Sequence, residues 1–208
     1  MKAFVFAGGS IRPEGIFEKK EEGDIVIAAD SGYLNAKKLG FSPDLLVGDF
    51  DSLGKANLPD GVERLELPAE KDVTDTQVAI EAAIEKGADQ IVIIGGLDGR
   101  LDHTLSNLAI LRMLSKRNIY ATASDGQNRA RYIRSGSIII ARSAFRYLSV
   151  LADDDVVKGV DIEGCKYPLK NAKIFREHQF AVSNEIVGNC ALIAVKKGGI
   201  FIIESSDK

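Results

Sequence analysis

The sequence contains no tryptophan, only two cysteines and no long apolar run. Cys165 and Cys190 are too few for a disulfide scaffold, and their spacing relative to His103 and His178 is not that of a metal site. The apolar run at residues 3–7 is too short for a signal peptide, and no stretch approaches the roughly 18 residues of a membrane-spanning helix. We therefore expect a cytoplasmic protein in a reducing environment, with no membrane partner.

An excess of basic charge is also lacking. The chain has 27 Lys and Arg against 30 Asp and Glu, a net charge of -3, and its basic residues are scattered along the sequence. This balance argues against nucleic acid or an anionic membrane as a partner. With 208 residues, 45% of them hydrophobic, the chain suits a globular protein of one large domain or two small ones.

Apolar runs alternate with helical patterns up to about residue 128. The expected strands cover residues 3–7, 24–30, 44–51, 90–96 and 119–125, and the expected helices cover 31–40, 74–87 and 101–117. Alternation of this kind predicts an α/β domain, with a mostly parallel sheet and helices on both of its faces.

From residue 129 onward the sequence contains short β-type segments separated by turn residues. These are 130–133, 137–142, 145–152, 156–164, 179–188, 190–198 and 199–206. The pattern predicts a C-terminal all-β sandwich, so we divide the chain into domains at 1–128 and 129–208. The second domain is small for its apolar content at 138–140 and 201–203, and this predicts a homodimer.

Aspartates follow several of the expected strands in the first domain. They are Asp30, Asp49, Asp51, Asp98, Asp102 and Asp125. In an extended chain Asp49 and Asp51 would share one face, with Phe50 on the other. Aspartate is also common in turns and at helix starts, and this explanation is the better one for Asp98 and Asp125. The set as a whole predicts an acidic site at the carboxyl edge of the sheet.

The segment KDVTDTQ, residues 71–77, begins the second expected helix. Thr74 and Gln77 have the spacing of a capping box. Asp75 in the first turn would be favoured by the helix dipole alone, but the same helix start would also hold a phosphate through an intervening cation. These two interpretations of Asp75 are equally supported.

The segment GGLDGRLDHTLSN, residues 95–107, places glycines and Arg100 between a strand and a helix. Such a loop can approach phosphates closely and grip them with a guanidinium. His103 is either a helix-start histidine or a ligand. Together with the carboxylates, the loop predicts a Mg²⁺-dependent nucleotide site, because Mg²⁺ prefers carboxylates and phosphate oxygens. These residues indicate metal-dependent transfer of a phosphorus group from a nucleotide, and they do not identify the acceptor.

Six motifs in order, AADSG, GDFDS, KDVTDTQ, GGLDGRLDHTLSN, KYPL and VSNE, resemble those of the thiamine pyrophosphokinase family. The resemblance implies an N-terminal α/β domain that binds ATP and Mg²⁺ and a C-terminal β-sandwich that binds thiamine and forms the dimer. It also implies transfer of the pyrophosphoryl group of Mg-ATP to the hydroxyl of thiamine, which gives thiamine diphosphate and AMP.

The resemblance also implies roles for single residues. The metal ligands are Asp49, Asp51 and Asp75, and Arg100 and Asp102 complete the catalytic set. The ATP site comprises Asp30, Ser31, Gly48, Asp72, Thr74, Gly96, Arg100, Asp102 and His103. The thiamine site comprises Lys71, Asp75, Tyr167, Ser183 and Asn184, with Tyr167 where animal members carry a stacking tryptophan.

Two other functions use the same features. A transferase could anchor a nucleotide sugar through a metal at GDFDS, but this leaves the segments KDVTD and SNE unexplained. A non-catalytic nucleotide or thiamine sensor could use the same scaffold, but every acidic cluster is retained here.

Overall fold

The computed structural model describes residues 1–50, 58–68 and 72–207; Asp51 and Lys71 lie outside these ranges. The chain divides into two compact units, Met1–Gly126 and Gln127–Lys208. None of the helices in the described ranges has the length and apolarity that crossing a bilayer requires.

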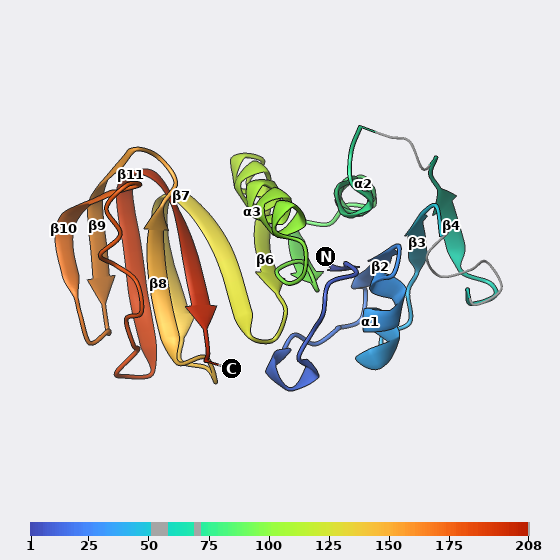
Figure 1. Ribbon diagram of the computed structural model, residues 1–208, viewed down its shortest axis with the longest axis horizontal. Helices are drawn as coiled ribbons and strands as arrows, with labels where there is room; N and C mark the ends of the chain where they lie inside the picture. The colour runs from blue at the N-terminus through green and yellow to red at the C-terminus, as the bar shows by residue number, and fades with distance from the viewer. Residues whose placement is uncertain (51–57, 69–71, 208) are drawn as a thin grey trace. The chain divides into compact units, whose positions relative to one another are not determined.

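The first unit is built on a parallel sheet (Figure 1). Its strands are β1 (Lys2–Phe6), β2 (Ile25–Ala29), β3 (Leu45–Gly48), β4 (Glu63–Glu66), β5 (Gln90–Ile94) and β6 (Tyr120–Ser124). Their order across the sheet is β6-β5-β1-β2-β3-β4, and every neighbouring pair is parallel. The predicted α/β class is confirmed.

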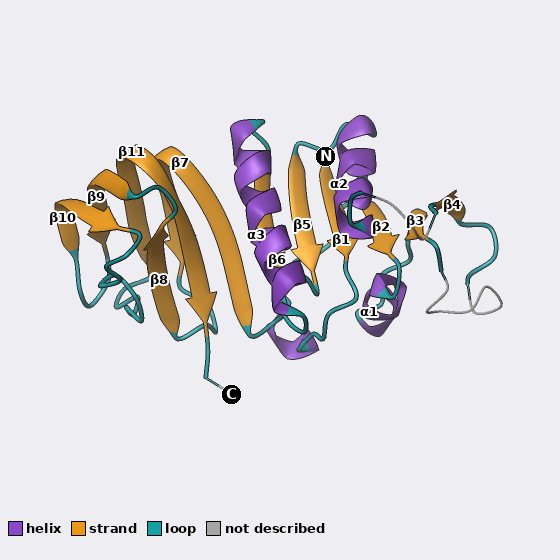
Figure 2. Ribbon diagram, turned by 45° about the horizontal axis from the view of Figure 1, so that its top comes forward, coloured by secondary structure: helices purple, strands orange, loops and turns teal. Residues whose placement is uncertain are grey.

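Helices cover both faces of this sheet, because both faces are apolar. Phe4 and Phe6 of β1 lie in a core cluster with Ala36 of α1 (Gly32–Lys38), whereas Ala3 and Val5 point to the other face and are also fully buried. Figures 1 and 2 show α2 (Asp75–Glu85) and α3 (Leu101–Lys116) on the side of the sheet opposite α1. A short 3-10 helix, η1 (Pro13–Gly15), follows β1.

The start of α2 and the ends of α1 and α2 carry the residues that the sequence predicts there. The Thr74 side chain caps α2 by accepting a hydrogen bond from the Gln77 backbone N–H at 3.2 Å, which confirms the capping interaction. Gly40 and Gly87, just beyond α1 and α2, have φ angles of 75° and 93°, in the left-handed region that glycine enters without strain.

Two features of this unit differ from the prediction. Strand β4 pairs with β3 at the sheet edge, but all four of its residues are exposed, so it carries no apolar pattern. The extended geometry expected after residue 47 is wrong, because β3 ends at Gly48 and Phe50 has a φ of 59°. Phe50 is 1% exposed and packs in the α1-side core, so burial of its ring offsets the cost of this backbone conformation.

The second unit is antiparallel. Its strands are β7 (Asn128–Ala141), β8 (Tyr147–Ala152), β9 (Val156–Glu163), β10 (Leu169–Phe175) and β11 (Cys190–Ser205). Strand β11 pairs with β7 along its whole length, with β9 along its first half and with β8 along its second half. Its register with β7 shifts between Val195 and Gly199, opposite Gly136, which has a φ of 142°.

These long strands correct part of the strand prediction. The segments expected at 130–133 and 137–142 are one strand, β7, and those at 190–198 and 199–206 are one strand, β11. Glycines in the middle of each strand were interpreted as turns, whereas they accommodate the irregularity in register. The strand expected at 179–188 is wrong, because this segment forms only isolated bridges, and β10 was not predicted.

Along the strands of the second unit, buried side chains mostly alternate with more exposed ones. Ile193, Ile200 and Ile202 of β11 are fully buried, together with Val157 and Val160 of β9. Of the apolar run at 138–140, Ile140 is buried but Ile139 is 68% exposed.

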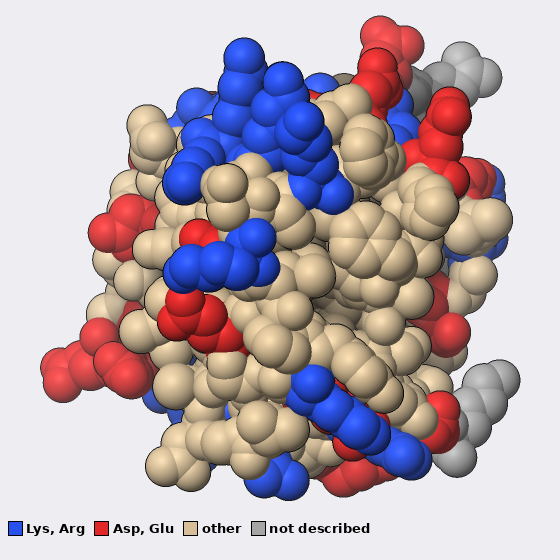
Figure 3. Space-filling model, turned by 90° about the vertical axis from the view of Figure 1, so that its left-hand side faces the viewer, with Lys and Arg blue, Asp and Glu red and all other residues tan. Residues whose placement is uncertain are grey.

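Basic residues that are scattered in the sequence gather on one part of the second unit's surface, as Figure 3 shows. The strand register explains one such group: Lys173 of β10 is opposite Lys158 of β9, which is opposite Lys197 of β11. Residues paired in this way point to the same face of a sheet. The spacing of lysines along the chain gave no indication of this grouping.

Candidate active site

A cavity of about 460 Å³ in the first unit lies beyond the carboxyl ends of strands β1, β2 and β5. Strand β1 lies between β2 and β5, so the chain leaves β1 toward one side of the sheet and returns later on the other. Loops diverge at such a point and leave a crevice, which is where open α/β sheets bind ligands. The cavity is lined by the segments 7–10, 29–31, 74–76, 95–96 and 98–100, with His103 and Asn107.

Glycines allow the loops around this cavity to pack closely. A Cβ on Gly8 would lie 2.1 Å from the Ser31 Oγ atom, and a Cβ on Gly9 would lie 2.4 Å from the Gly95 carbonyl oxygen. The Gly9 N–H also donates a hydrogen bond to the Gly95 carbonyl at 2.9 Å. The loops after β1 and β5 therefore form one backbone-lined wall, which phosphates can approach closely.

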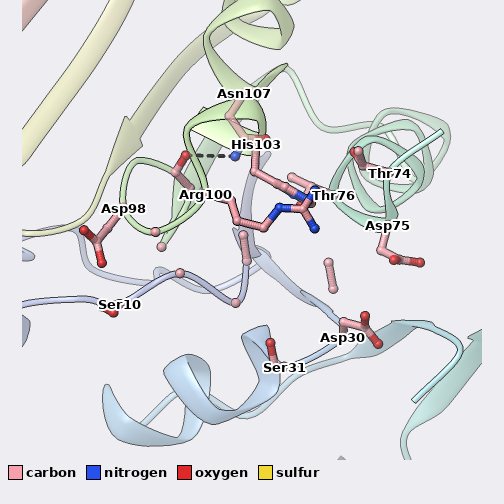
Figure 4. A pocket seen from close by; sticks show the side chains of 17 residues that line it. Ser10, Asp30, Ser31, Thr74, Asp75, Thr76, Asp98, Arg100, His103 and Asn107 are labelled. Carbon is pink, nitrogen blue, oxygen red and sulfur yellow. Dashed lines mark hydrogen bonds between the residues drawn. The ribbon is translucent and has the colours of Figure 1, made fainter. Parts of the chain in front are cut away.

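Asn107 supports this wall from α3. Its side chain is 5% exposed, and its Nδ2 atom donates to the Gly96 carbonyl at 2.8 Å (Figure 4). A Cβ on Gly96 would lie 2.9 Å from the same Nδ2 atom, so Gly96 leaves room for this contact.

Three carboxylates line the cavity, at Asp30, Asp75 and Asp98. Asp30 follows β2 with a φ of 51°, and Asp75 begins α2 (Figure 4). The Asp30 carboxylate lies over Gly48, where a Cβ would be 2.6 Å from its Oδ1 atom. Gly48 therefore makes room for Asp30, and any other residue there would push this carboxylate away.

Arg100 lines the cavity at the start of α3, and Figure 4 shows its side chain directed toward the start of α2. It is held by Asp102 through two hydrogen bonds, of 2.6 Å from Nη2 and 3.1 Å from Nε. These contacts raise the pKa of Arg100 and, with a further bond from the His103 backbone N–H, hold the pKa of Asp102 below its ordinary value. Both side chains are exposed, so the pair orients the guanidinium more than it stabilises the fold.

The residues predicted to bind ATP or the metal are brought together in part. Those that line the cavity are Asp30, Ser31, Thr74, Asp75, Gly96, Arg100 and His103. Gly48, Asp49, Asp72 and Asp102 are not among the described residues that line it. Within the described ranges, no three Asp, Glu, His or Cys side chains are grouped closely enough to hold a metal ion together.

The segment 8–10 and Thr76 also line the cavity, although they are not among the predicted site residues. The signal for 8–10 was present, because Gly8 and Gly9 follow an apolar strand in the same way as Gly95 and Gly96. Thr76 had no comparable signal, since a polar residue in a first helical turn is common.

Two of the residues predicted to bind thiamine, Tyr167 and Asn184, line a small hollow of about 60 Å³ in the second unit, and Ser183 is not among the described residues that line it. The Tyr167 ring is 61% exposed and lines this hollow with Phe180 and Val182. Asn184 is 5% exposed, and its side chain accepts a hydrogen bond from the Tyr167 N–H at 2.9 Å and donates one to the Tyr167 carbonyl at 2.7 Å. Ser183 is exposed with a φ of 55°, and its N–H donates to the Ser149 Oγ atom at 3.0 Å.

Two family models match this chain, one in each unit. Residues 18–123 match the family described as thiamin pyrophosphokinase, catalytic domain, and residues 137–200 match thiamin pyrophosphokinase, vitamin B1 binding domain. The chain belongs to the thiamine pyrophosphokinase family.

Relatives within the thiamine pyrophosphokinase family match nearly the whole chain. Thiamine pyrophosphokinase of Bacillus subtilis is 31% identical over 192 residues, which is 90% of each chain. The crystal structure of the Bacillus subtilis protein superposes with a TM-score of 0.89 at 28% identity and covers 100% of both chains. That of thiamin pyrophosphokinase from Geobacillus thermodenitrificans gives 0.85 at 28% identity, over 100% of this chain and 99% of the other.

Proposed function

We propose that the protein transfers the pyrophosphoryl group of Mg-ATP to thiamine. The thiamine hydroxyl oxygen forms a bond to the β-phosphorus of ATP, the bond from that phosphorus to the oxygen bridging to the α-phosphorus breaks, and AMP leaves with that oxygen. The hydroxyl proton passes to a base, for which the carboxylates around the cavity are the candidates. The observation that carries this proposal is the cavity at the carboxyl ends of β1, β2 and β5, in a chain of this family.

Glycine backbone and Arg100 would bind the phosphates. The loops at 8–9 and 95–96 come close without side chains, and the N-terminus of α2, capped by Thr74, faces the same cavity. Arg100 would bind phosphate oxygens while Asp102 keeps its guanidinium oriented. Phosphoryl transfer depends mainly on positioning and on charge neutralisation, and these groups supply both.

Carboxylates at the cavity support a site for Mg²⁺. Asp75 and Asp30 both line the cavity, and carboxylate oxygens beside phosphates are what Mg²⁺ prefers. We propose Asp49, Asp51 and Asp75 as the ligands; Asp51 lies outside the described residues. When bound, Mg²⁺ would neutralise charge on the phosphates. Asp30 lines the cavity and its carboxylate lies over Gly48, the residue before Asp49, which supports a position for Asp49 near the cavity.

The second unit would bind thiamine. The exposed Tyr167 ring can stack on the cationic thiazolium or on the pyrimidine, and Phe180 adds a second apolar ring to the same hollow. Asn184 would act by fixing the backbone of Tyr167, since its amide is already bonded there on both sides. Lys71, Asp75 and Ser183 remain proposed thiamine contacts, as Asp72 and His103 remain proposed ATP contacts.

We propose a homodimer in the cytoplasm. Ile139, Tyr167 and Val187 of the second unit each have more than half of their surface exposed, which supports a partner surface there. Light scattering with size-exclusion chromatography should give twice the chain mass of 22.5 kDa. A mass of one chain at micromolar concentration would refute the dimer.

Mass spectrometry of a single reaction tests the function. Purified protein with ATP, Mg²⁺ and thiamine should form thiamine diphosphate and AMP in equal amounts. Formation of ADP and thiamine monophosphate would refute pyrophosphoryl transfer. Binding of both substrates without products would favour a sensor, and turnover of UDP-sugars but not thiamine would favour the nucleotide-sugar transferase.

A further inference from the structure

We propose that Asn35 is a positioning residue that holds the loop Ala7–Gly9 in the shape that binds the phosphates of ATP. The proposal rests on the function proposed above. Asn35 lies in α1 and is not among the described residues lining the cavity, so it would act through the loop and not on the nucleotide itself.

Both hydrogens of the Asn35 amide are used on this loop. Its Nδ2 atom donates to the Ala7 carbonyl and to the Gly9 carbonyl, each at 2.7 Å. The N–H groups of the same two residues donate to the Ile94 and Gly95 carbonyls at 2.8 and 2.9 Å. The polar backbone groups of Ala7 and Gly9 are therefore all bound to protein.

The backbone of Gly8, which lies between these two residues, is bonded differently. It lines the cavity and is exposed, and its N–H makes no hydrogen bond with any described part of the chain. By fixing the residues on either side, Asn35 leaves the Gly8 N–H at the cavity as a backbone donor without a partner in the described chain. A donor fixed in advance binds a phosphate oxygen without the cost of ordering the loop.

The Asn35 amide also sits where the loops after β1 and β5 meet. A Cβ on Gly95 would lie 2.8 Å from its Nδ2 atom and 2.6 Å from the Ala7 carbonyl oxygen. A side chain at position 95 would therefore displace this amide, and glycine there leaves space for it. A single side chain thus sets the position of one loop against the other.

An asparagine at position 35 is unfavourable for the stability of the helix in which it lies. Asparagine is among the less favourable residues in a helix interior, because its side chain competes for backbone hydrogen bonds. Asn35 is in the middle of α1, a helix of seven residues, and its side-chain bonds go to another element. A role outside the helix accounts for this choice.

The test compares Asn35→Asp with a matched helix variant. Asn35→Asp keeps the size of the side chain but replaces the donating nitrogen by an oxygen that faces two carbonyls. We expect the KM for ATP to rise at least tenfold, with the KM for thiamine at saturating ATP unchanged within twofold. Asn35→Ala, which removes the donor without adding charge, should raise the KM for ATP in the same direction and serves if the Asp variant does not fold.

Ala36→Gly is the control for a purely structural role. Ala36 is fully buried in α1, so this change destabilises the helix and leaves the loop contacts intact. It should lower Tm and leave the KM for ATP within twofold of the wild type. If the Asn35 variants lower Tm in the same way and also leave the KM for ATP unchanged, Asn35 is structural and the proposal is wrong.

Calorimetric titration of ATP without thiamine separates this proposal from the proposed function. If the wild type binds ATP at least tenfold more tightly than Asn35→Asp but forms no thiamine diphosphate, the positioning role holds and the proposed function fails. If the wild type forms thiamine diphosphate and Asn35→Asp binds ATP equally well, the function holds and the positioning role fails.

Discussion

Replacing Gly9 by alanine should impair ATP use by moving a wall of the cavity. A Cβ at this position would lie 2.4 Å from the Gly95 carbonyl oxygen and 2.8 Å from the Asp98 carbonyl oxygen. Both neighbours are backbone atoms, so neither can rotate away. The φ of Gly9 is not in the left-handed region, so alanine adds no backbone strain of its own and the effect is steric.

The size of the effect follows from these distances. Ordinary contacts of a Cβ begin at 3.4 Å, so the loops after β1 and β5 must separate by about 1 Å. A misplacement of about 1 Å in a positioning element can cost about 10²-fold in rate, which corresponds to about 2.7 kcal/mol. We expect kcat/KM for ATP to fall by about this factor, measured from AMP formation at saturating thiamine.

Gly188→Ala is the control for this prediction. A Cβ at Gly188 meets no atom within 4 Å, and its φ is not positive, so only the effect on the unfolded chain remains. This variant should keep wild-type kcat/KM. A Gly9→Ala enzyme with kcat/KM within threefold of the wild type would show that the loops can separate freely, and would refute the reasoning.

Three further predictions concern single side chains. Asp49→Asn should lower kcat at least about 10³-fold because it removes a proposed metal ligand, with an unchanged circular dichroism spectrum; full activity would remove Asp49 from the site. Thr74→Ala should lower the free energy of unfolding, measured by urea titration, by about 1 kcal/mol, because the α2 cap is lost. Thr74→Ser retains the hydroxyl and should keep the wild-type free energy of unfolding. An equal loss of stability in both variants would contradict a capping role. Burial raises the pKa of Asp24, but hydrogen bonds from the backbone N–H groups of Glu21 and Lys2 outweigh it and hold that pKa below its ordinary value. The ionised Asp24 carboxylate therefore stabilises the folded protein at neutral pH, and this contribution is lost as the pH falls below about 4. The difference in unfolding free energy between wild type and Asp24→Asn should shrink between pH 7 and pH 3. A constant difference would be evidence against a lowered pKa of Asp24.

Much of the first unit could be predicted because local and tertiary signals agree there. Strands such as Ile25–Ala29 are continuous apolar runs, as expected for a sheet buried on both faces, and Thr74 marks the start of a helix by side-chain chemistry alone. Strand β4 could not be found, since an exposed edge strand of four residues needs no apolar pattern. Its existence depends on pairing with β3, which is a long-range contact.

The second unit was less predictable, because a glycine has the same local signal in a turn and in an irregular strand. Gly136 and Gly199 lie within β7 and β11, and only the pairing of these two strands shows that the chain continues through them. The segment 179–188 has strand-like residues, but its backbone bonds are divided among several partners.

For the site, the acidic and glycine motifs indicated the correct edge of the sheet but not every residue there. The segment 8–10 after β1 has a glycine pair but no charged side chain, so its sequence did not indicate that it forms part of the cavity wall. The roles of Asn35 and Asn107 depend on carbonyl groups that lie far away in the sequence or in another element, and a residue type alone does not indicate them.

Strand β11 pairs with β7, β8 and β9, yet it is the last of the unit's strands in chain order. During synthesis the first unit has all six of its strands once residue 124 is made, whereas the second unit lacks the strand that joins its other elements until residues 190–205 follow. Edges of β7, β8 and β9 stay unpaired during this interval, and unpaired edges are sites of aggregation. The two halves of the chain therefore differ in when they can fold, and the growing chain is most exposed to misassembly between residues 128 and 205.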